Sequence, residues 1–299
     1  MEIGAPPLEA LVGELEHRSA AARRAAAERL GEQGLAAQAA VPALIRRLKD
    51  KSKRVRMAAI WALGEAGAGA RDTVPSLLRA LVHEDADLRV TAADALGRIG
   101  APALPLVKTL LDHPDWRARQ AAALSLGNIA ERSPEAVPAL APLLKDAHEE
   151  VRARAAWALG LAGRGAGAGD AARLLADALA RETGFVRIWV AEAVGALGPG
   201  GAVAVPALRA ALRDEEADTR LAAAKALGAI GAAEGESVAV FAEALRHADA
   251  GVREEAALCL EELGPVAAPA VPELLVARKD PSSAVRSAVE RALEACRAE

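Results

Sequence analysis

The stretch Val55-Arg56-Met57-Ala58-Ala59-Ile60-Trp61-Ala62-Leu63-Gly64 decides the fold, because its framework returns along the whole chain. The framework is an apolar residue and an arginine, followed by alanine three residues after the arginine and by Leu-Gly at seven and eight. The marker arginines of the successive copies are Arg23, Arg56, Arg89, Arg119, Arg152, Arg187, Arg220, Arg253 and Arg286. Six of the eight steps between them are 33 residues, and the other two are 30 and 35. A fixed period of this size predicts stacked units, each of which buries its apolar face on its neighbours.

Each copy is expected to be a helical hairpin. Val41-Pro42 opens a first helix, with proline in the first turn, where a missing N–H costs nothing. Apolar residues continue at helical spacing as far as Leu48, and the polar run 49–52 then breaks the pattern. A second helix carries the quoted stretch and is expected to end at Gly64 and Gly67, because glycine suits a left-handed C-cap.

The repeat predicts an all-α, right-handed α-solenoid of about nine stacked helical hairpins, forming a single domain over residues 1–299. We expect capping units at about 1–40 and 271–299. The step of 35 coincides with the glycine-rich stretch 160–169, which is expected to be a flexible joint. This stretch lacks the Gly-Lys-Ser/Thr ending of a phosphate-binding loop, so the sequence does not favour a nucleotide site there.

Composition narrows the class of protein. Apolar residues make up 53% of the chain and aromatic residues only 2%, so the core is expected to consist of Ala, Leu and Val. A net charge of -4 disfavours a general polyanion binder. Of the two cysteines, Cys259 is expected to be buried and Cys296 exposed, and they provide no disulfide framework. The absence of a signal peptide and of a membrane-length apolar run predicts a cytoplasmic protein that does not enter a membrane. We expect this protein to be a monomer.

The opening Val-Pro, the aspartate of the turn and the pattern Val-Arg-x-x-Ala-Ala-x-Ala-Leu-Gly resemble HEAT repeats, especially the short bacterial kind of the phycocyanobilin lyases. The resemblance implies a hydrogen-bonded ladder between units, made by the repeat arginines and by aspartates six residues before the next arginine. The expected ladder arginines are Arg56, Arg89, Arg119, Arg152, Arg187, Arg220, Arg253 and Arg286, and the aspartates are Asp50, Asp146, Asp214 and Asp280.

The aromatic residues point to a candidate binding face. On a helical wheel, positions -1, +3, +6 and +7 from the arginine form the core side, whereas -2, +1, +2 and +5 point away and -3 lies at the rim. In HEAT-like solenoids the second helices line the concave face. The residues placed on that face are Met57, Trp61, Trp116, Leu124, Trp157, Phe185, Ile188 and Trp189. Tryptophan dominates protein interfaces, so we expect these residues to anchor a protein or peptide partner, with packing against neighbouring units as the alternative. The other phenylalanine, Phe241, is expected in the core.

Charges on the same face refine the expected partner. Arg54, Arg117 and Arg154 lie among the tryptophans and are expected to pair with acidic groups of the partner. The acidic residues Glu192, Asp218, Glu254 and Glu255 occupy the later copies of the same positions. The sequence therefore favours a mixed-charge protein segment over a phosphate backbone.

Catalysis is not expected, and no cofactor or metal is implied. Deoxyhypusine hydroxylase, a HEAT-repeat enzyme, holds iron through His-Glu pairs on inner helices, but the matching positions here are Val90-Thr91, Ala153-Arg154 and Glu254-Glu255. Two alternatives remain from the resemblance: nucleic-acid binding of the HEAT-like DNA glycosylase type, and tetrapyrrole binding of the bilin lyase type. The acidic groove argues against the first, and family resemblance alone supports the second.

Overall fold

The computed structural model describes residues 7–67, 72–83, 85–163 and 167–297, and within these ranges it contains helices and no strand. The helices form nine successive pairs, as an all-α solenoid requires, so the predicted fold class is confirmed. Contacts divide the chain into two compact blocks, Met1–Gly167 and Ala168–Glu299, which we call the N-terminal and C-terminal blocks. Part of the expected joint, residues 164–166, lies outside the described residues, whereas residues 160–162 belong to a helix.

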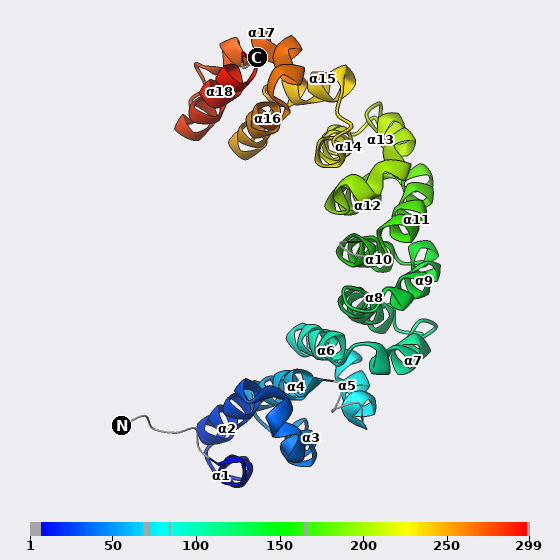
Figure 1. The fold of residues 1–299 in the computed structure, drawn as a ribbon, viewed down its shortest axis with the longest axis vertical. Helices are drawn as coiled ribbons and strands as arrows, with labels where there is room; N and C mark the ends of the chain where they lie inside the picture. Colours follow the sequence, from blue (N-terminus) through cyan, green and yellow to red (C-terminus); the bar gives the residue numbers. More distant parts are fainter. Residues whose placement is uncertain (1–6, 68–71, 84, 164–166, 298–299) are drawn as a thin grey trace. The chain divides into compact units, whose positions relative to one another are not determined.

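The N-terminal block has two layers of helices (Figure 1). The first helices are α1 (Leu8–Glu14), α3 (Val41–Arg47), α5 (Val74–Leu81), α7 (Leu104–Val107) and α9 (Val137–Leu140). The second helices are α2 (Ala20–Glu32), α4 (Lys53–Glu65), α6 (Ala86–Ile99), α8 (Trp116–Ala130) and α10 (Glu149–Ala162), and each packs against the next one in this order. The 3-10 segment η1 (Gly34–Ala40) joins the first two hairpins, and η4 (Lys108–Leu110) and η6 (Pro142–Lys145) continue α7 and α9. Pro142 explains the break after α9, because proline cannot donate the helical hydrogen bond.

The C-terminal block repeats this arrangement. Its first helices are α11 (Ala168–Arg181), α13 (Val205–Ala211), α15 (Gly235–Ala244) and α17 (Val271–Ala277). Its second helices are α12 (Gly184–Ala196), α14 (Ala217–Ile230), α16 (Ala250–Leu263) and α18 (Ser283–Ala295). The α15 helix packs against both α14 and α16, and its Phe241 is fully buried, as predicted.

Two glycines at the end of the second hairpin, Gly64 and Gly67, have different roles. Gly67 has a positive φ of 60° and follows α4, as a left-handed C-cap does. The expectation that Gly64 also caps the helix is wrong, because Gly64 lies inside α4 and is buried. A Cβ at Gly64 would lie 2.7 Å from the Cα of Ala95 on α6. Glycine is needed there because the two second helices approach so closely.

The two cysteines differ from the sequence expectation. Cys296, expected to be exposed, is buried at the end of α18, whereas Cys259, expected to be buried, is half-buried. Burial raises the pKa of the Cys259 thiol to about 11, so the thiol stays protonated near neutral pH. No helix in the described ranges has both the length and the apolar character of a transmembrane span.

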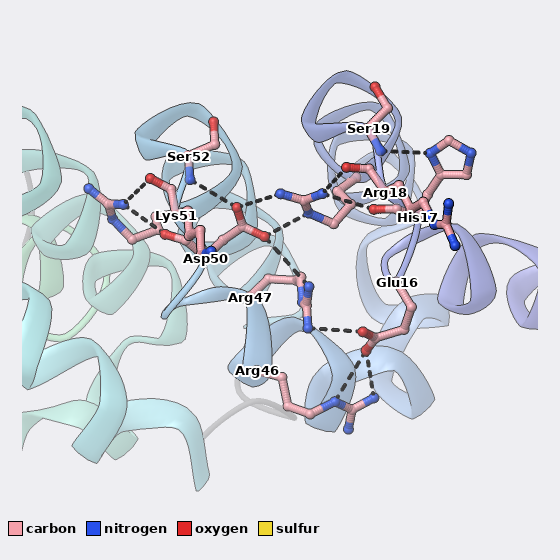
Figure 2. Close-up of polar contacts among 11 residues, drawn as sticks. Glu16, His17, Arg18, Ser19, Arg46, Arg47, Asp50, Lys51 and Ser52 are labelled. Atoms are coloured by element: carbon pink, nitrogen blue, oxygen red, sulfur yellow. Dashed lines mark hydrogen bonds and ion pairs between the residues drawn. The ribbon is translucent and has the colours of Figure 1, made fainter.

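Arginine–aspartate pairs connect neighbouring hairpins. Arg23 donates from Nε and Nη2 to the two carboxylate oxygens of Asp50, at 2.7 and 2.8 Å. Figure 2 shows the labelled Asp50 with its hydrogen bonds as dashed lines. The same two-bond pairing joins Arg119 to Asp146 and Arg253 to Asp280, and Arg187 bonds Asp214 through Nη1. In every case the aspartate follows its arginine by 27 residues and belongs to the next hairpin. We call each such pair a rung.

The arginines also hold the turn of their own hairpin. Arg119 Nη1 donates to the carbonyls of His113 and Pro114, at 2.7 and 3.3 Å. Arg56 and Arg286 make the same two bonds to the turns that precede them. The arginine therefore stabilises a hairpin even where no aspartate follows in the next one.

The rungs predict a pH dependence of stability. Hydrogen bonds from Arg23 and Arg253 hold the pKa values of Asp50 and Asp280 below their ordinary value. In the unfolded chain these carboxyls protonate near pH 3.9, whereas in the folded chain they stay ionised to lower pH. Unfolding therefore takes up protons below about pH 5, and the free energy of unfolding falls as the pH falls through the folded pKa values.

Urea unfolding of wild type and Asp280→Asn between pH 3 and pH 7 measures this contribution. We expect Asp280→Asn to be less stable near neutral pH, and the difference to shrink below about pH 4, as the wild-type carboxyl loses its charge. A difference that stays constant over this range would contradict the assignment.

Candidate partner-binding face

The α8 and α10 helices carry the densest group of the sequence-predicted face residues. Trp116 begins α8, and its half-buried ring stacks on the ring of His148, the residue before α10, with centroids 5.4 Å apart. The exposed Arg117 places its guanidinium carbon 4.8 Å from the Trp116 ring centroid. One tryptophan face is thus held between hairpins while the side chain stays partly open to solvent.

A second cation–π pair lies on α10. The guanidinium carbon of Arg154 is 5.1 Å from the ring centroid of Trp157, and both residues are half-buried. Burial lowers the pKa of Arg154, but an arginine remains charged at neutral pH. Because a partly desolvated cation lies beside an aromatic ring here, a carboxylate of a partner would bind it more strongly than in water.

The α12 helix carries the aromatic residues of the C-terminal block. Phe185 and Trp189 meet edge to face with ring centroids 6.1 Å apart. Phe185 is 49% exposed, and Ile188 and Trp189 are half-buried. A half-exposed phenylalanine supported by a tryptophan is the kind of apolar anchor that interfaces use.

Trp61 on α4 serves packing as well. A Cβ built on Gly31 of α2 would lie 2.2 Å from a Trp61 ring carbon, so the ring lies directly on this glycine. Trp61 and Met57 are half-buried, Arg54 is exposed, and Leu124 on α8 is half-buried. The packing alternative therefore describes Trp61 better than it describes Trp116 or Trp157.

The structure adds His148 to the residues that the sequence singled out for this face. The ring of His148 supports Trp116 from the next hairpin. The repeat positions of the two residues could have predicted this contact. Trp116 lies three residues before Arg119, and His148 lies four residues before Arg152, the marker arginine of the next hairpin. Residues at nearly equal register in adjacent hairpins are expected to be neighbours.

At least one of the acidic side chains that the sequence places on the face of the C-terminal block already has a partner within the chain. Glu255 on α16 forms an ion pair with Lys225 on α14 at 2.5 Å, and both side chains are partly exposed. Among the described residues, no three His, Cys, Asp or Glu side chains are grouped as a metal site requires.

Comparison with known proteins identifies the class. The family model described as HEAT repeats matches residues 8–88, 74–160, 137–228 and 205–294. These ranges span nearly the whole chain, so the chain belongs to the HEAT-repeat family. A comparison with curated protein sequences finds no significant match.

Solved solenoid structures share the fold. A mutant of Kap121p superposes with a TM-score of 0.69 at 16% identity, covering 95% of this chain and 37% of that one. Importin beta superposes with a TM-score of 0.55 at 14% identity, covering 96% and 44%. This chain spans less than half the length of either protein, and at these identities the likeness concerns the fold alone.

Proposed function

We propose that this HEAT-repeat chain is a non-catalytic scaffold or adaptor that holds a protein or peptide on the face of its second helices. The anchors are Trp116 and Trp157 in the N-terminal block, and Phe185, Ile188 and Trp189 in the C-terminal block. Trp61, Met57 and Leu124 extend the same face. No cofactor takes part in this function.

The observation that carries the proposal is the pairing of each α8 or α10 tryptophan with an arginine on a partly open surface. Trp116 lies beside Arg117, and Trp157 lies beside Arg154. An apolar ring next to a cation is matched by a partner segment that alternates apolar and acidic side chains. Tryptophan and arginine are also the residue types that contribute most to protein interfaces.

Charge on the N-terminal part of the face supports an acidic partner segment. Arg54 and Arg117 are exposed on the same set of positions. Arg117 forms a long ion pair with Asp115 at 3.8 Å, whereas Arg54 has no ion-pair partner among the described residues. Arg54 therefore remains available for a carboxylate of the partner. Rim charges of this kind steer association and set partner choice more than they set affinity.

The test is affinity capture from the source organism, followed by titration of the purified partner against variants. Trp116→Ala and Trp157→Ala are each expected to weaken binding by about 30-fold, the effect of losing about 2 kcal/mol at an interface anchor. Leu35→Ser is the matched control, because Leu35 is 66% exposed but lies on η1, outside the second helices.

Circular dichroism and thermal unfolding must show that each variant is folded. Folded tryptophan variants that bind the partner as tightly as wild type would overturn the proposal and leave these rings a packing role.

A further inference from the structure

We call the contact between two successive hairpins a junction, and the junction that follows Arg56 has no arginine–aspartate rung. The residue 27 positions after Arg56 is His83, where Asp50 and Asp146 stand for other arginines. Arg56 Nη1 still holds its own turn, because it donates to the carbonyls of Asp50 and Lys51. Its Nε is buried and has no hydrogen-bond partner, whereas Nε of Arg23 and of Arg119 each donates to an aspartate.

His83 replaces the turn function of the aspartate but not its charge. In the rungs, the aspartate also accepts a hydrogen bond from the backbone N–H two residues later, as Asp50 does from Ser52. His83 Nδ1 accepts the equivalent bond from the N–H of Asp85 at 3.0 Å. Since Nδ1 is the acceptor, the ring hydrogen lies on Nε2, which is therefore a donor.

A pocket opens where the carboxylate is missing. Its volume is about 710 Å³, within the range of small-molecule sites. Its lining includes the cationic side chains of Arg46, Lys49, Arg56 and Arg79, together with the ring of His83. The one carboxylate among the described lining residues, Asp50, is already bound to Arg23 and to Arg47. Of the lining cations, Arg46 is paired with Glu16 at 3.4 Å.

A second junction shows how the chain itself fills such a gap. Arg220 is followed 27 positions later by His247, and here Glu243 accepts a hydrogen bond from Arg220 Nη2 at 2.8 Å. Glu243 stands four residues before His247, and the residue four before His83 is Arg79. The Arg56 junction thus has the cation of Arg79 at the position where the Arg220 junction has the carboxylate of Glu243.

We propose that the pocket between the α3–α4 and α5–α6 hairpins binds an anion with two or more carboxylates, one of which completes the rung on Arg56. The bound carboxylate takes the place that aspartate holds at the other rungs. Nε2 of His83 donates to it, and Lys49 and Arg79 neutralise the remaining charge. This ligand chemistry fits a free polycarboxylate and a run of acidic side chains in a peptide.

Isothermal titration of the full chain at low ionic strength tests the site with citrate, a hexaglutamate peptide and inorganic phosphate as probes. We expect saturable one-to-one binding of citrate or of the peptide, and the tighter of the two identifies the source of the carboxylates. Phosphate is expected to bind at least about tenfold more weakly, because its oxygens match the planar rung less well. Phosphate that binds as tightly as both carboxylate probes would overturn the assignment to a carboxylate.

Two variants that restore a carboxylate within the chain keep the test independent of misfolding. His83→Asp and Arg79→Glu are each expected to abolish citrate and peptide binding, and to raise the unfolding midpoint by about 2–4 °C because they complete the rung internally. Lys279→Gln removes an exposed cation after α17 and is expected to change neither quantity. Absence of saturable binding to wild type, or undiminished binding by His83→Asp, would overturn the proposal.

Discussion

Arg119→Ala is expected to lower the free energy of unfolding by about 2–3 kcal/mol, because it leaves the carboxylate of Asp146 without its partner in a mostly buried position. The Asp146 side chain is 7% exposed and that of Arg119 is 13% exposed, so water replaces the lost hydrogen bonds poorly. Urea unfolding at pH 7 measures the change. The effect is expected to be nearly as large for Asp146→Ala, and much of it is common to both substitutions because they break the same rung.

Arg56→Ala is the matched control for Arg119→Ala. Arg56 occupies the same register and holds its own turn by the same two bonds, but no carboxylate pairs with it among the described residues. Substitution of Arg56 removes only its packing and its hydrogen bonds to the turn, so we expect the free energy of unfolding to fall by about 1 kcal/mol. Equal losses for the two variants would show that the rung contributes nothing beyond the turn.

Gly127→Ala is expected to destabilise the chain by about 1–3 kcal/mol through overpacking between α8 and α10. A Cβ at this position would lie 2.7 Å from the Cβ of Ala158 and 2.9 Å from its Cα. The backbone of α10 cannot move away without disturbing the stacking of the hairpins. The greater helix propensity of alanine, worth about 1 kcal/mol, offsets only part of this cost.

Gly228→Ala is the control for Gly127→Ala, and it is expected to change the stability in the opposite direction. Gly228 on α14 stands eight residues after its marker arginine, as Gly127 does, yet nothing lies within 4 Å of a Cβ built there. Only the propensity gain remains, so we expect stabilisation by about 0.5–1 kcal/mol. Thermal or urea unfolding of the two variants side by side tests the argument, and destabilisation of both would refute it.

The helical hairpins follow from the sequence because their signals are local. The opening Val-Pro and the helical spacing of apolar residues can be recognised within a single copy of the repeat. The role of Gly64 could not be inferred in the same way, since it depends on how closely Ala95 approaches from a different hairpin. A glycine near the end of a predicted helix fits a C-cap and a close helix contact equally well, and the distance between the two helices decides.

For the candidate face, too, the sequence predicts which side of a helix a residue occupies but not what the next hairpin places against it. The helical wheel assigns Trp61 and Trp116 to one face, but only the neighbouring hairpin distinguishes their surroundings. Gly31 receives the Trp61 ring, whereas Trp116 meets His148 and an exposed arginine. Cys296 was misplaced because the wheel argument ends where the repeat ends, and the last helix still buries its final turn.

The histidine at position 83, where other hairpins have an aspartate, has a consequence for how the chain unfolds. In a linear array each hairpin is held only by its neighbours, so cooperativity is set junction by junction. A junction with an arginine–aspartate rung transmits order to the next hairpin, and a junction such as Arg56–His83 transmits it less strongly. Hydrogen exchange or mechanical pulling is therefore expected to separate the array first at the Arg56–His83 junction, whereas the Arg220–His247 junction keeps the bond from Arg220 to Glu243.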